Sequence, residues 1–222
     1  MNLLRPIAPI LKIIAGVYTN KEREFSYKNI TVKVLPGVFH PGLFFSTKML
    51  LNFIDTLNLE SKTFLELGAG TGIISMLAAK KRAAVYASDI STKAVENIKI
   101  NAAKNKVQIK IFASDLFKNI PDMQFDYIII NPPYYNRDPK EEKEYAWFCG
   151  SNFEYFKSLF KSLSNFMSNS SIVFMILSEV CDIHKIQSLG IENEFAWKLK
   201  MKKQFWGEKN FIFKIKKSNL KQ

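Results

Sequence analysis

The sequence contains few cysteines, few histidines and no long uninterrupted apolar run. Its 222 residues include two cysteines, Cys149 and Cys181, and two histidines, His40 and His184. Two cysteines cannot build a disulfide framework and are typical of a reducing compartment, so we predict a cytoplasmic protein. Because no cysteine or histidine stands at ligand spacing from another, we expect no metal site.

The longest apolar stretch, residues 3–17, lies near the N-terminus. Arg5 and Lys12 interrupt it, and Pro6 and Pro9 break any regular helix. The stretch is too short to span a bilayer, and no small-residue cleavage site follows it. We therefore expect a packed or surface-lying extension and no stable membrane insertion.

Acidic residues are outnumbered by basic ones, 20 against 32, which gives a net charge of +12. The surplus is uneven, because residues 198–222 carry nine lysines and a single acid, Glu208. Such a stretch attracts phosphates or an acidic protein surface. The chain is also rich in Ile, Asn and Phe, a composition that accompanies lysine enrichment without any functional cause. Both interpretations stay open.

Strands that alternate with helices from residue 62 onward indicate an α/β domain with a mostly parallel sheet and helices on both faces. In such a sheet ligands bind at the carboxyl ends of the strands. Before this pattern we expect a strand at 30–34 and a helix at 46–57. The later expected strands are 63–67, 83–88, 107–113, 125–130, 172–177, 195–201 and 211–215, and the later expected helices are 73–81, 92–104, 153–167 and 182–188.

A glycine-rich turn, Glu-Leu-Gly-Ala-Gly-Thr-Gly over residues 66–72, follows the strand at 63–67. Gly68 and Gly70 allow a tight turn with no Cβ in the way of a ligand, and Gly72 lets the next helix begin close to the strand. A turn of this kind is weak as a signal on its own, because dinucleotide-binding enzymes also use one.

Two acids follow the next two strands. Asp89 is placed to accept hydrogen bonds from both ribose hydroxyls of a nucleoside, although it could instead cap the following helix. Asp115 ends the strand at 107–113, where an aspartate is also a common turn residue. Acids at consecutive strand ends, all beside the glycine turn, favour a nucleoside cofactor.

The tetrapeptide Asn-Pro-Pro-Tyr at 131–134 follows the buried strand at 125–130. Two prolines force the backbone out of the sheet, so the Asn131 side-chain oxygen and the Pro132 carbonyl can converge on an NH2 group. Tyr134 offers a flat face for stacking a planar group. Two acceptors on an amide or aryl amine raise the electron density on its nitrogen and align it for attack, so no strong base is required. NAD chemistry would leave this tetrapeptide unexplained.

Together, the glycine turn, the two acids and the tetrapeptide resemble the small-domain superfamily of class I methyltransferases, which use S-adenosylmethionine. The superfamily includes release-factor glutamine methyltransferases and ribosomal RNA guanine- or adenine-amino methyltransferases. The resemblance implies a Rossmann-like seven-stranded, mostly parallel sheet whose last strand is antiparallel. It also implies that residues 1–58 form an N-terminal extension with a substrate-side lid segment, and that residues 59–222 form the methyltransferase domain.

The resemblance also implies roles for individual residues. Glu66 orients the cofactor's ammonium group, Asp115 binds the adenine amino group and Leu116 lies against the ring. The implied catalytic residues are Asn131, Pro132, Pro133 and Tyr134. The implied cofactor contacts are Glu66, Gly68, Ala69, Gly70, Thr71, Gly72, Asp89, Ile90, Asp115, Leu116 and Asn131. The substrate-side candidates are Phe39, His40, Phe45, Thr47 and Trp147.

The substrate is the open question. Residues 145–150 (Tyr-Ala-Trp-Phe-Cys-Gly) resemble a stretch of the eukaryotic and archaeal release-factor enzymes, which favours a protein glutamine. The lysines of 198–222 suggest an RNA or DNA base instead, so the substrate could belong to a release factor or to the ribosome. A small-molecule amine and a catalytically inactive nucleic-acid-binding module remain alternatives, and the need for an accessory subunit is open.

Overall fold

The computed structural model describes residues 21–205 and 207–218, so the extension expected at residues 3–17 lies outside the described residues. In chain order the elements are β1 (Arg23–Tyr27), β2 (Ile30–Val34), α2 (Phe45–Asp55), β3 (Thr63–Leu67), α3 (Ile73–Lys80), β4 (Ala84–Asp89), α4 (Thr92–Asn105), β5 (Lys110–Ala113), β6 (Tyr127–Ile130), η1 (Glu142–Glu144), α5 (Glu154–Leu163), η2 (Ser164–Phe166), β7 (Ile172–Ser178), α6 (Ile183–Glu192), β8 (Phe195–Phe205) and β9 (Glu208–Lys217).

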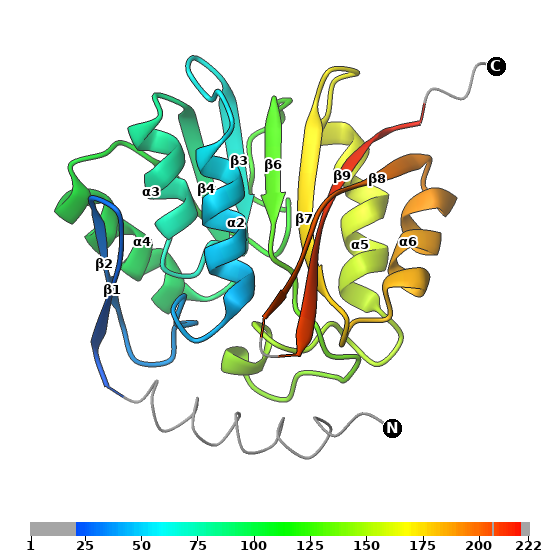
Figure 1. Ribbon diagram of the computed structural model, residues 1–222, viewed down its shortest axis with the longest axis horizontal. Coiled ribbons are helices and arrows are strands. Elements are labelled where there is room, and N and C mark those ends of the chain that lie inside the picture. The colour runs from blue at the N-terminus through cyan, green and yellow to red at the C-terminus, as the bar shows by residue number, and fades with distance from the viewer. Residues whose placement is uncertain (1–20, 206, 219–222) are drawn as a thin grey trace.

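The main sheet has seven strands in the order β5-β4-β3-β6-β7-β9-β8 (Figure 1). The first five of these strands are parallel to one another, whereas β9 lies antiparallel to both β7 and β8. The predicted Rossmann-like fold with an antiparallel last strand is therefore confirmed. All five parallel strands end at one edge of the sheet, and the β8–β9 hairpin also turns at that edge.

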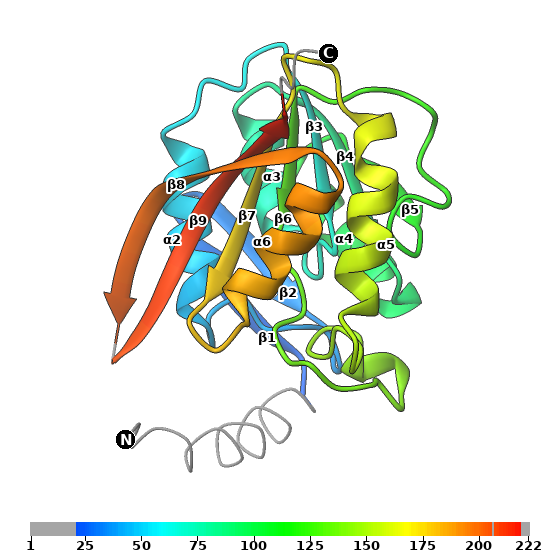
Figure 2. The same cartoon turned by 90° about the vertical axis from the view of Figure 1, so that its right-hand side faces the viewer.

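Helices cover both faces of the sheet (Figure 2). Along the strands successive side chains point to opposite faces, so Leu65 and Ile128 pack with α5 and α6 while Phe64 and Ile129 pack with α2, α3 and α4. Two hydrophobic clusters result, one on each face. This double coverage explains why Ile128, Ile129 and Ile130 are all fully buried.

The sequence placed most of these elements within a few residues and missed strand β1 and the short helix η1. Strand β1 was not predicted, and its residues are mostly exposed. Strand β5 begins at Lys110 rather than at 107, because Lys106 takes a left-handed φ of 54° and Val107 donates its N–H to Ala102, which ends α4. Strands β8 and β9 extend beyond the predicted 195–201 and 211–215 into a long hairpin.

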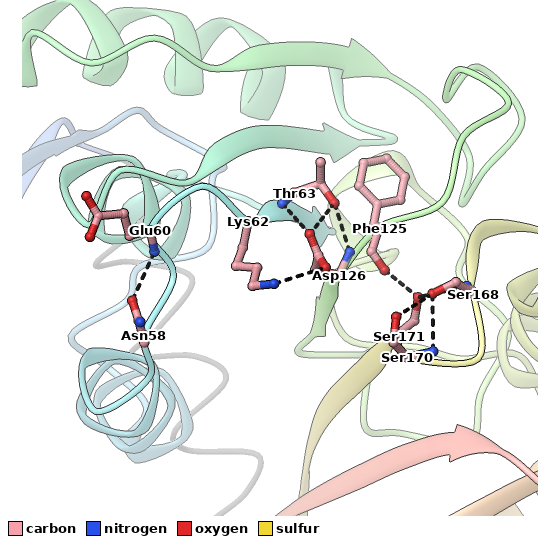
Figure 3. A network of polar contacts seen from close by, with 9 residues as sticks. All are labelled: Asn58, Glu60, Lys62, Thr63, Phe125, Asp126, Ser168, Ser170 and Ser171. Atoms are coloured by element: carbon pink, nitrogen blue, oxygen red, sulfur yellow. Dashed lines mark hydrogen bonds and ion pairs between the residues drawn. The ribbon is translucent and has the colours of Figure 1, made fainter.

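A polar network ties the amino ends of three strands together at the edge opposite the carboxyl ends (Figure 3). Asp126 accepts hydrogen bonds from the Thr63 backbone N–H at 2.9 Å and the Thr63 hydroxyl at 3.0 Å. The Ser171 hydroxyl donates to the Phe125 carbonyl at 2.6 Å. These contacts link β3, β6 and β7 at their amino ends. They therefore also fix how the carboxyl ends of the three strands are aligned.

Candidate active site

The strand register brings the predicted motifs to one level of the sheet. Leu67 of β3 pairs with Ile130 of β6 on one side and with Ser88 of β4 on the other. Neighbouring strands lie about 4.8 Å apart. The glycine turn, Asp89 and Asn131 therefore leave three adjacent strands side by side.

The glycine turn has the open backbone that its sequence predicts. Gly68, Gly70 and Gly72 have φ angles of 68°, 54° and 74°, in the left-handed region that favours glycine. A Cβ on Gly72 would come within 3.0 Å of Ile98, so helix packing requires glycine there. A Cβ on Gly68 would meet no atom within 4 Å, so space for a ligand lies in front of the turn.

Asp89 is joined directly to this turn. Its Oδ2 atom accepts the Gly70 N–H at 2.8 Å, and its Oδ1 atom accepts the Ser91 N–H at 3.0 Å. Burial raises the pKa of Asp89, and the two N–H donors oppose that rise. A carboxylate has about four lone-pair positions, so Asp89 retains acceptor capacity for a ligand. Ile90 beside it is exposed.

Glu66 lies inside the fold, behind the turn. Its Oε2 atom accepts the Ser75 N–H at 2.8 Å and the Ser75 hydroxyl. Burial raises the pKa of Glu66 to about 8. Glu66 thus binds the first turn of α3. Ala69 and Thr71 are buried in the same turn, and the Ala69 N–H donates to the Ser88 carbonyl at 2.9 Å.

Asp115 and Leu116 lie further out along the same edge. Asp115 is exposed and its carboxylate is 2.6 Å from the Lys118 ammonium. Leu116 has a left-handed φ of 50°. Both residues line a surface recess of about 270 Å³ beside α5. Tyr155 of α5 was not singled out in the sequence, yet it lies within electrostatic range of both Asp89 and Asp115. Burial raises the pKa of Tyr155.

At the tetrapeptide, Pro132 and Pro133 are buried while Asn131 and Tyr134 are half-buried. The Tyr134 hydroxyl donates to Asn131 Oδ1 at 3.0 Å, which holds the amide oxygen in place. Burial raises the pKa of Tyr134 well above the usual value, and the nearby Ser46 hydroxyl opposes that rise. Ser46 is a contact that the sequence did not predict.

The Trp147 segment runs along the continuation of the tetrapeptide. The Tyr135 N–H donates to the Trp147 carbonyl at 2.9 Å, and the Cys149 N–H donates to the Tyr135 carbonyl at 2.9 Å. These bonds hold residues 145–150 next to Tyr134. Trp147, a substrate-side candidate, therefore lies on a segment that is bonded to the continuation of the tetrapeptide.

Three aromatic rings form a cluster between the loop that precedes α2 and Trp147. The Phe39 and Phe44 rings stack with centroids 4.9 Å apart, and the Trp147 ring lies 5.3 Å from Phe39 and 5.0 Å from Phe44. A Cβ on Gly70 would lie 3.9 Å from Phe39, so this cluster borders the glycine turn. Phe44 is the member that the sequence analysis did not single out.

The other substrate-side candidates lie apart from this cluster. Phe45 stacks on Phe205 at the tip of the β8–β9 hairpin, with centroids 4.6 Å apart. His40 is buried, its ring edge lies against Phe25 and its Nδ1 atom accepts the Gly42 N–H at 3.1 Å. Thr47 is buried in the first turn of α2.

Helix α4 holds β2 through a row of asparagines that the sequence analysis missed. Asn97, Asn101 and Asn105 stand on one side of α4 and bond to the backbone of β2, where Asn101 Oδ1 accepts the Lys33 N–H at 2.7 Å. Asn101 Nδ2 also donates to the Thr71 carbonyl at 2.9 Å. Strand β2 and the glycine turn are therefore both bonded to the Asn101 side chain. The available signal was asparagine at every fourth position of the predicted helix.

Within the described residues, no group of three or more His, Cys, Asp or Glu side chains could hold a metal ion. No helix in that part of the chain is long and apolar enough to cross a membrane. The geometry that remains is a set of backbone and carboxylate acceptors beside an open turn, next to an amide oxygen flanked by an aromatic ring.

Comparison with known proteins gives this geometry a family. A putative protein N5-glutamine methyltransferase of Methanocaldococcus jannaschii is 33% identical over 184 residues, which cover 78% of this chain and 91% of that protein. The ribosomal RNA small subunit methyltransferase C of Haemophilus influenzae is 37% identical over 112 residues, which cover 49% of this chain but only 33% of that protein. The chain thus spans nearly all of the first relative and a third of the second.

Solved structures share the fold at lower identity. A 16S rRNA methyltransferase of T. Thermophilus in complex with AdoMet and guanosine has a TM-score of 0.65 at 18% identity, over 88% of this chain and 50% of that chain. An E. cuniculi complex responsible for the methylation of the translation termination factor eRF1 has a TM-score of 0.64 at 20% identity, over 82% and 99%.

The comparisons therefore support an N-methyltransferase enzyme with the predicted fold. The methyltransferase small domain family matches residues 29–148, which contain the glycine turn, both acids, the tetrapeptide and Trp147. More than half of the sequence lies in that match, and the chain belongs to the methyltransferase small domain family.

Proposed function

We propose that the chain is an S-adenosylmethionine-dependent N-methyltransferase that acts on a planar NH2 group, with a protein glutamine as the favoured substrate. The observation that carries the proposal is the pairing of Leu67 with Ile130, which puts the glycine turn next to Asn131. A methyl donor bound at the turn and an amide held by Asn131 would then be neighbours. The M. jannaschii relative, named for glutamine methylation, supports the same substrate class.

The residues present fit the cofactor. The space in front of Gly68 suits a ligand that approaches the backbone, and Asp89 retains acceptor capacity for ribose hydroxyls. Glu66 is buried behind the turn and would act on the cofactor's ammonium group indirectly. Asp115, Leu116 and Tyr155 would border the adenine. Bound S-adenosylmethionine supplies an electrophilic methyl group on a sulfonium.

The chain's own residues would position the nucleophile. Asn131 Oδ1 accepts the Tyr134 hydroxyl through one lone pair, and its second lone pair can accept a substrate N–H. The Pro132 carbonyl would take the other N–H, and the Tyr134 ring would stack on the planar group. Held in this way, the amide nitrogen would be aligned with the methyl group that the bound cofactor would supply, and methylation would displace one of its N–H protons. The displaced N–H proton leaves to water.

The lid segment would close the substrate side. Residues 1–58 supply Phe39 and Phe44, whose stacking with Trp147 screens the region between the glycine turn and Tyr134. Water exclusion assists methyl transfer, because positive charge on sulfur is lost during the reaction. We propose a supporting rather than a substrate-binding place for His40, since its ring is packed against Phe25.

Labelled methyl transfer into a cell lysate tests the proposal. Label that protease removes and nuclease leaves, recovered as N-methylglutamine after digestion, is the expected result. Label that nuclease removes would identify a base amino group, the second candidate, which the lysine-rich stretch 198–222 favours. Label in neither macromolecular fraction would point to a small molecule. Methyl transfer to the substrate in whole lysate, but not to the same substrate after purification, would show that an accessory subunit is required.

A further inference from the structure

The outer hairpin of the sheet carries lysines gathered on one face. Lys198 of β8 and Lys214 of β9 are directly paired, so their side chains project to the same side. Lys216 lies two residues beyond Lys214 and shares that side. Lys200 lies at the register shift between Leu199 and Met201. We call Lys198, Lys200, Lys214 and Lys216 the lysine face.

The lysine face is electrically uncompensated. Among the residues that the structure describes, none of its four members forms an ion pair, whereas Lys209 of the same hairpin pairs with Glu179 at 3.6 Å. Burial and the neighbouring Lys216, Lys200 and Lys198 lower the pKa of Lys214. Like charges so close together destabilise the free protein, which is what a surface built for a polyanion would show.

Protection of a sheet edge is the simpler explanation for lysine on an outer strand. It accounts for Lys198 and Lys200, because β8 is the outermost strand. It does not account for Lys214 and Lys216, because β9 lies between β7 and β8 and has no open edge. Edge protection therefore explains only half of the lysine face.

The lysine face leads to the candidate active site. Strand β8 has 11 residues, so it is roughly 36 Å long at about 3.3 Å per residue. Its far end is Phe205, which is 49% exposed and stacks on Phe45 at the start of α2. Glu208, the partner of Phe205 across the hairpin, accepts the Ser178 hydroxyl and lies within electrostatic range of Tyr134.

We propose that the lysine face binds the sugar–phosphate backbone of single-stranded RNA and that Phe205 stacks on a base next to the active site. Lysines at alternate positions of a strand are roughly 6.6 Å apart, twice the rise per residue. That spacing suits successive phosphates of an extended single strand. A basic track that ends in an exposed aromatic ring is the arrangement by which proteins hold single strands. Binding of an acidic protein surface would not require an aromatic ring at Phe205.

Binding of a fluorescent single-stranded oligouridylate to the full-length protein, measured by anisotropy across a salt series without cofactor, tests the proposal. The variant Lys198→Gln/Lys214→Gln is expected to bind about tenfold more weakly at low salt. Its slope of log affinity against log salt is expected to be shallower by about 1.4, since each phosphate contact on a single strand contributes about 0.7. The matched control is Lys157→Gln/Lys161→Gln, two exposed lysines of α5 on the opposite face of the sheet, which should change neither quantity.

A second variant tests the stacked ring. Phe205→Ala is expected to weaken oligouridylate binding about tenfold while it leaves the salt slope unchanged, because stacking on a base releases no counterions. Circular dichroism melting of all variants checks that the hairpin remains folded. A duplex RNA of equal length should bind wild type and Phe205→Ala equally.

Two results would overturn the proposal. One is equal RNA binding by the lysine variant and its α5 control. The other is tighter binding of an oligoglutamate peptide than of oligouridylate, with the same loss in the lysine variant, because an acidic protein would then be the partner. The proposed methyl transfer is judged separately. Asn131→Ala should bind oligouridylate like wild type, and a protein that binds RNA but never transfers a methyl group would contradict only the proposed function.

Discussion

The two halves of the candidate site are built from different interactions. On the cofactor side, beside β3 and β4, hydrogen bonds fix the geometry. Asp89 accepts the Gly70 N–H at 2.8 Å and Glu66 accepts the Ser75 N–H at 2.8 Å. On the substrate side, rings from distant segments stack, as Phe39 does with Trp147 at 5.3 Å and Phe45 with Phe205 at 4.6 Å.

Hydrogen bonds demand a distance and a direction, whereas apolar stacking demands little beyond contact. The cofactor half is therefore suited to hold one ligand in one pose. In the substrate half, the aromatic residues and the shape of the site can change without a change in the sheet. This difference gives a physical reason why one family contains relatives named for protein and for RNA substrates.

The largest effect is expected at the boundary of the two halves. Asn131→Ala should slow methyl transfer by about 100-fold or more, because it removes an oriented acceptor in the transition state. Cofactor affinity, measured by calorimetry, should change by less than about threefold. Asn136→Ala, an exposed asparagine after the tetrapeptide, is the control and should keep its activity. Transfer by Asn131→Ala within tenfold of wild type would refute the proposed chemistry.

Within the cofactor half, Asp89→Asn should weaken binding of S-adenosylhomocysteine by about 30-fold, or about 2 kcal/mol, because charge-assisted hydrogen bonds are lost. Asp115→Asn should cost only about threefold, because Asp115 is exposed and already paired with Lys118. Calorimetry on both variants measures the two losses of affinity for S-adenosylhomocysteine. Equal losses would show that the two acids contribute alike.

The raised pKa of Glu66 predicts that the free energy of unfolding depends on pH. Its pKa is raised to about 8 from a usual value of 4.5, so the folded state retains a proton that the unfolded state releases. The stabilisation relative to an ordinary glutamate is complete below pH 4.5 and is lost as pH rises through 8. The free energy of unfolding should therefore fall with pH in this window, by up to about 1.4 kcal/mol per unit. Urea melts of wild type and Glu66→Gln measure it, and an equally steep fall in the variant would exclude Glu66 as the cause.

Asn101 and Asn105 of α4 allow an effect on stability to be separated from an effect on cofactor binding. Asn101→Ala and Asn105→Ala both remove bonds to β2, so both should lower the free energy of unfolding by about 1–3 kcal/mol. Only Asn101 also bonds to Thr71, so only its variant should bind S-adenosylhomocysteine more weakly, by about fivefold. If the two variants bind it equally, the Thr71 contact has no influence on the cofactor turn.

In the substrate half, Trp147→Leu should raise KM about threefold with little change in cofactor affinity, because one ring of the cluster is lost. Tyr145→Leu, at an exposed position of the same segment, should leave KM unchanged. A rise in the cofactor dissociation constant instead of KM would assign the aromatic cluster to the cofactor half.

The same contrast explains what could be predicted from the sequence. The glycine turn, Asp89 and the tetrapeptide follow β3, β4 and β6, which lie side by side in the sheet, so their meeting follows from the topology of a parallel sheet. By contrast, Phe205 of the β8–β9 hairpin stacks on Phe45, which lies 160 residues earlier in the chain. Contacts of this kind depend on helix placement and hairpin length, which no local pattern encodes.

The asparagine row has a consequence for how this enzyme could change over time. Asn97, Asn101 and Asn105 grip the N–H and carbonyl groups of β2, which every residue type except proline provides in the same form. The exposed side chains of β1 can therefore vary without loosening this attachment, whereas Ile30, Val32 and Val34 of β2 are buried and have to stay apolar. Because the bonds from α4 reach only the backbone of β2, the proposed lid segment could change at its exposed positions, and with it the substrate, while the rest of the fold is retained.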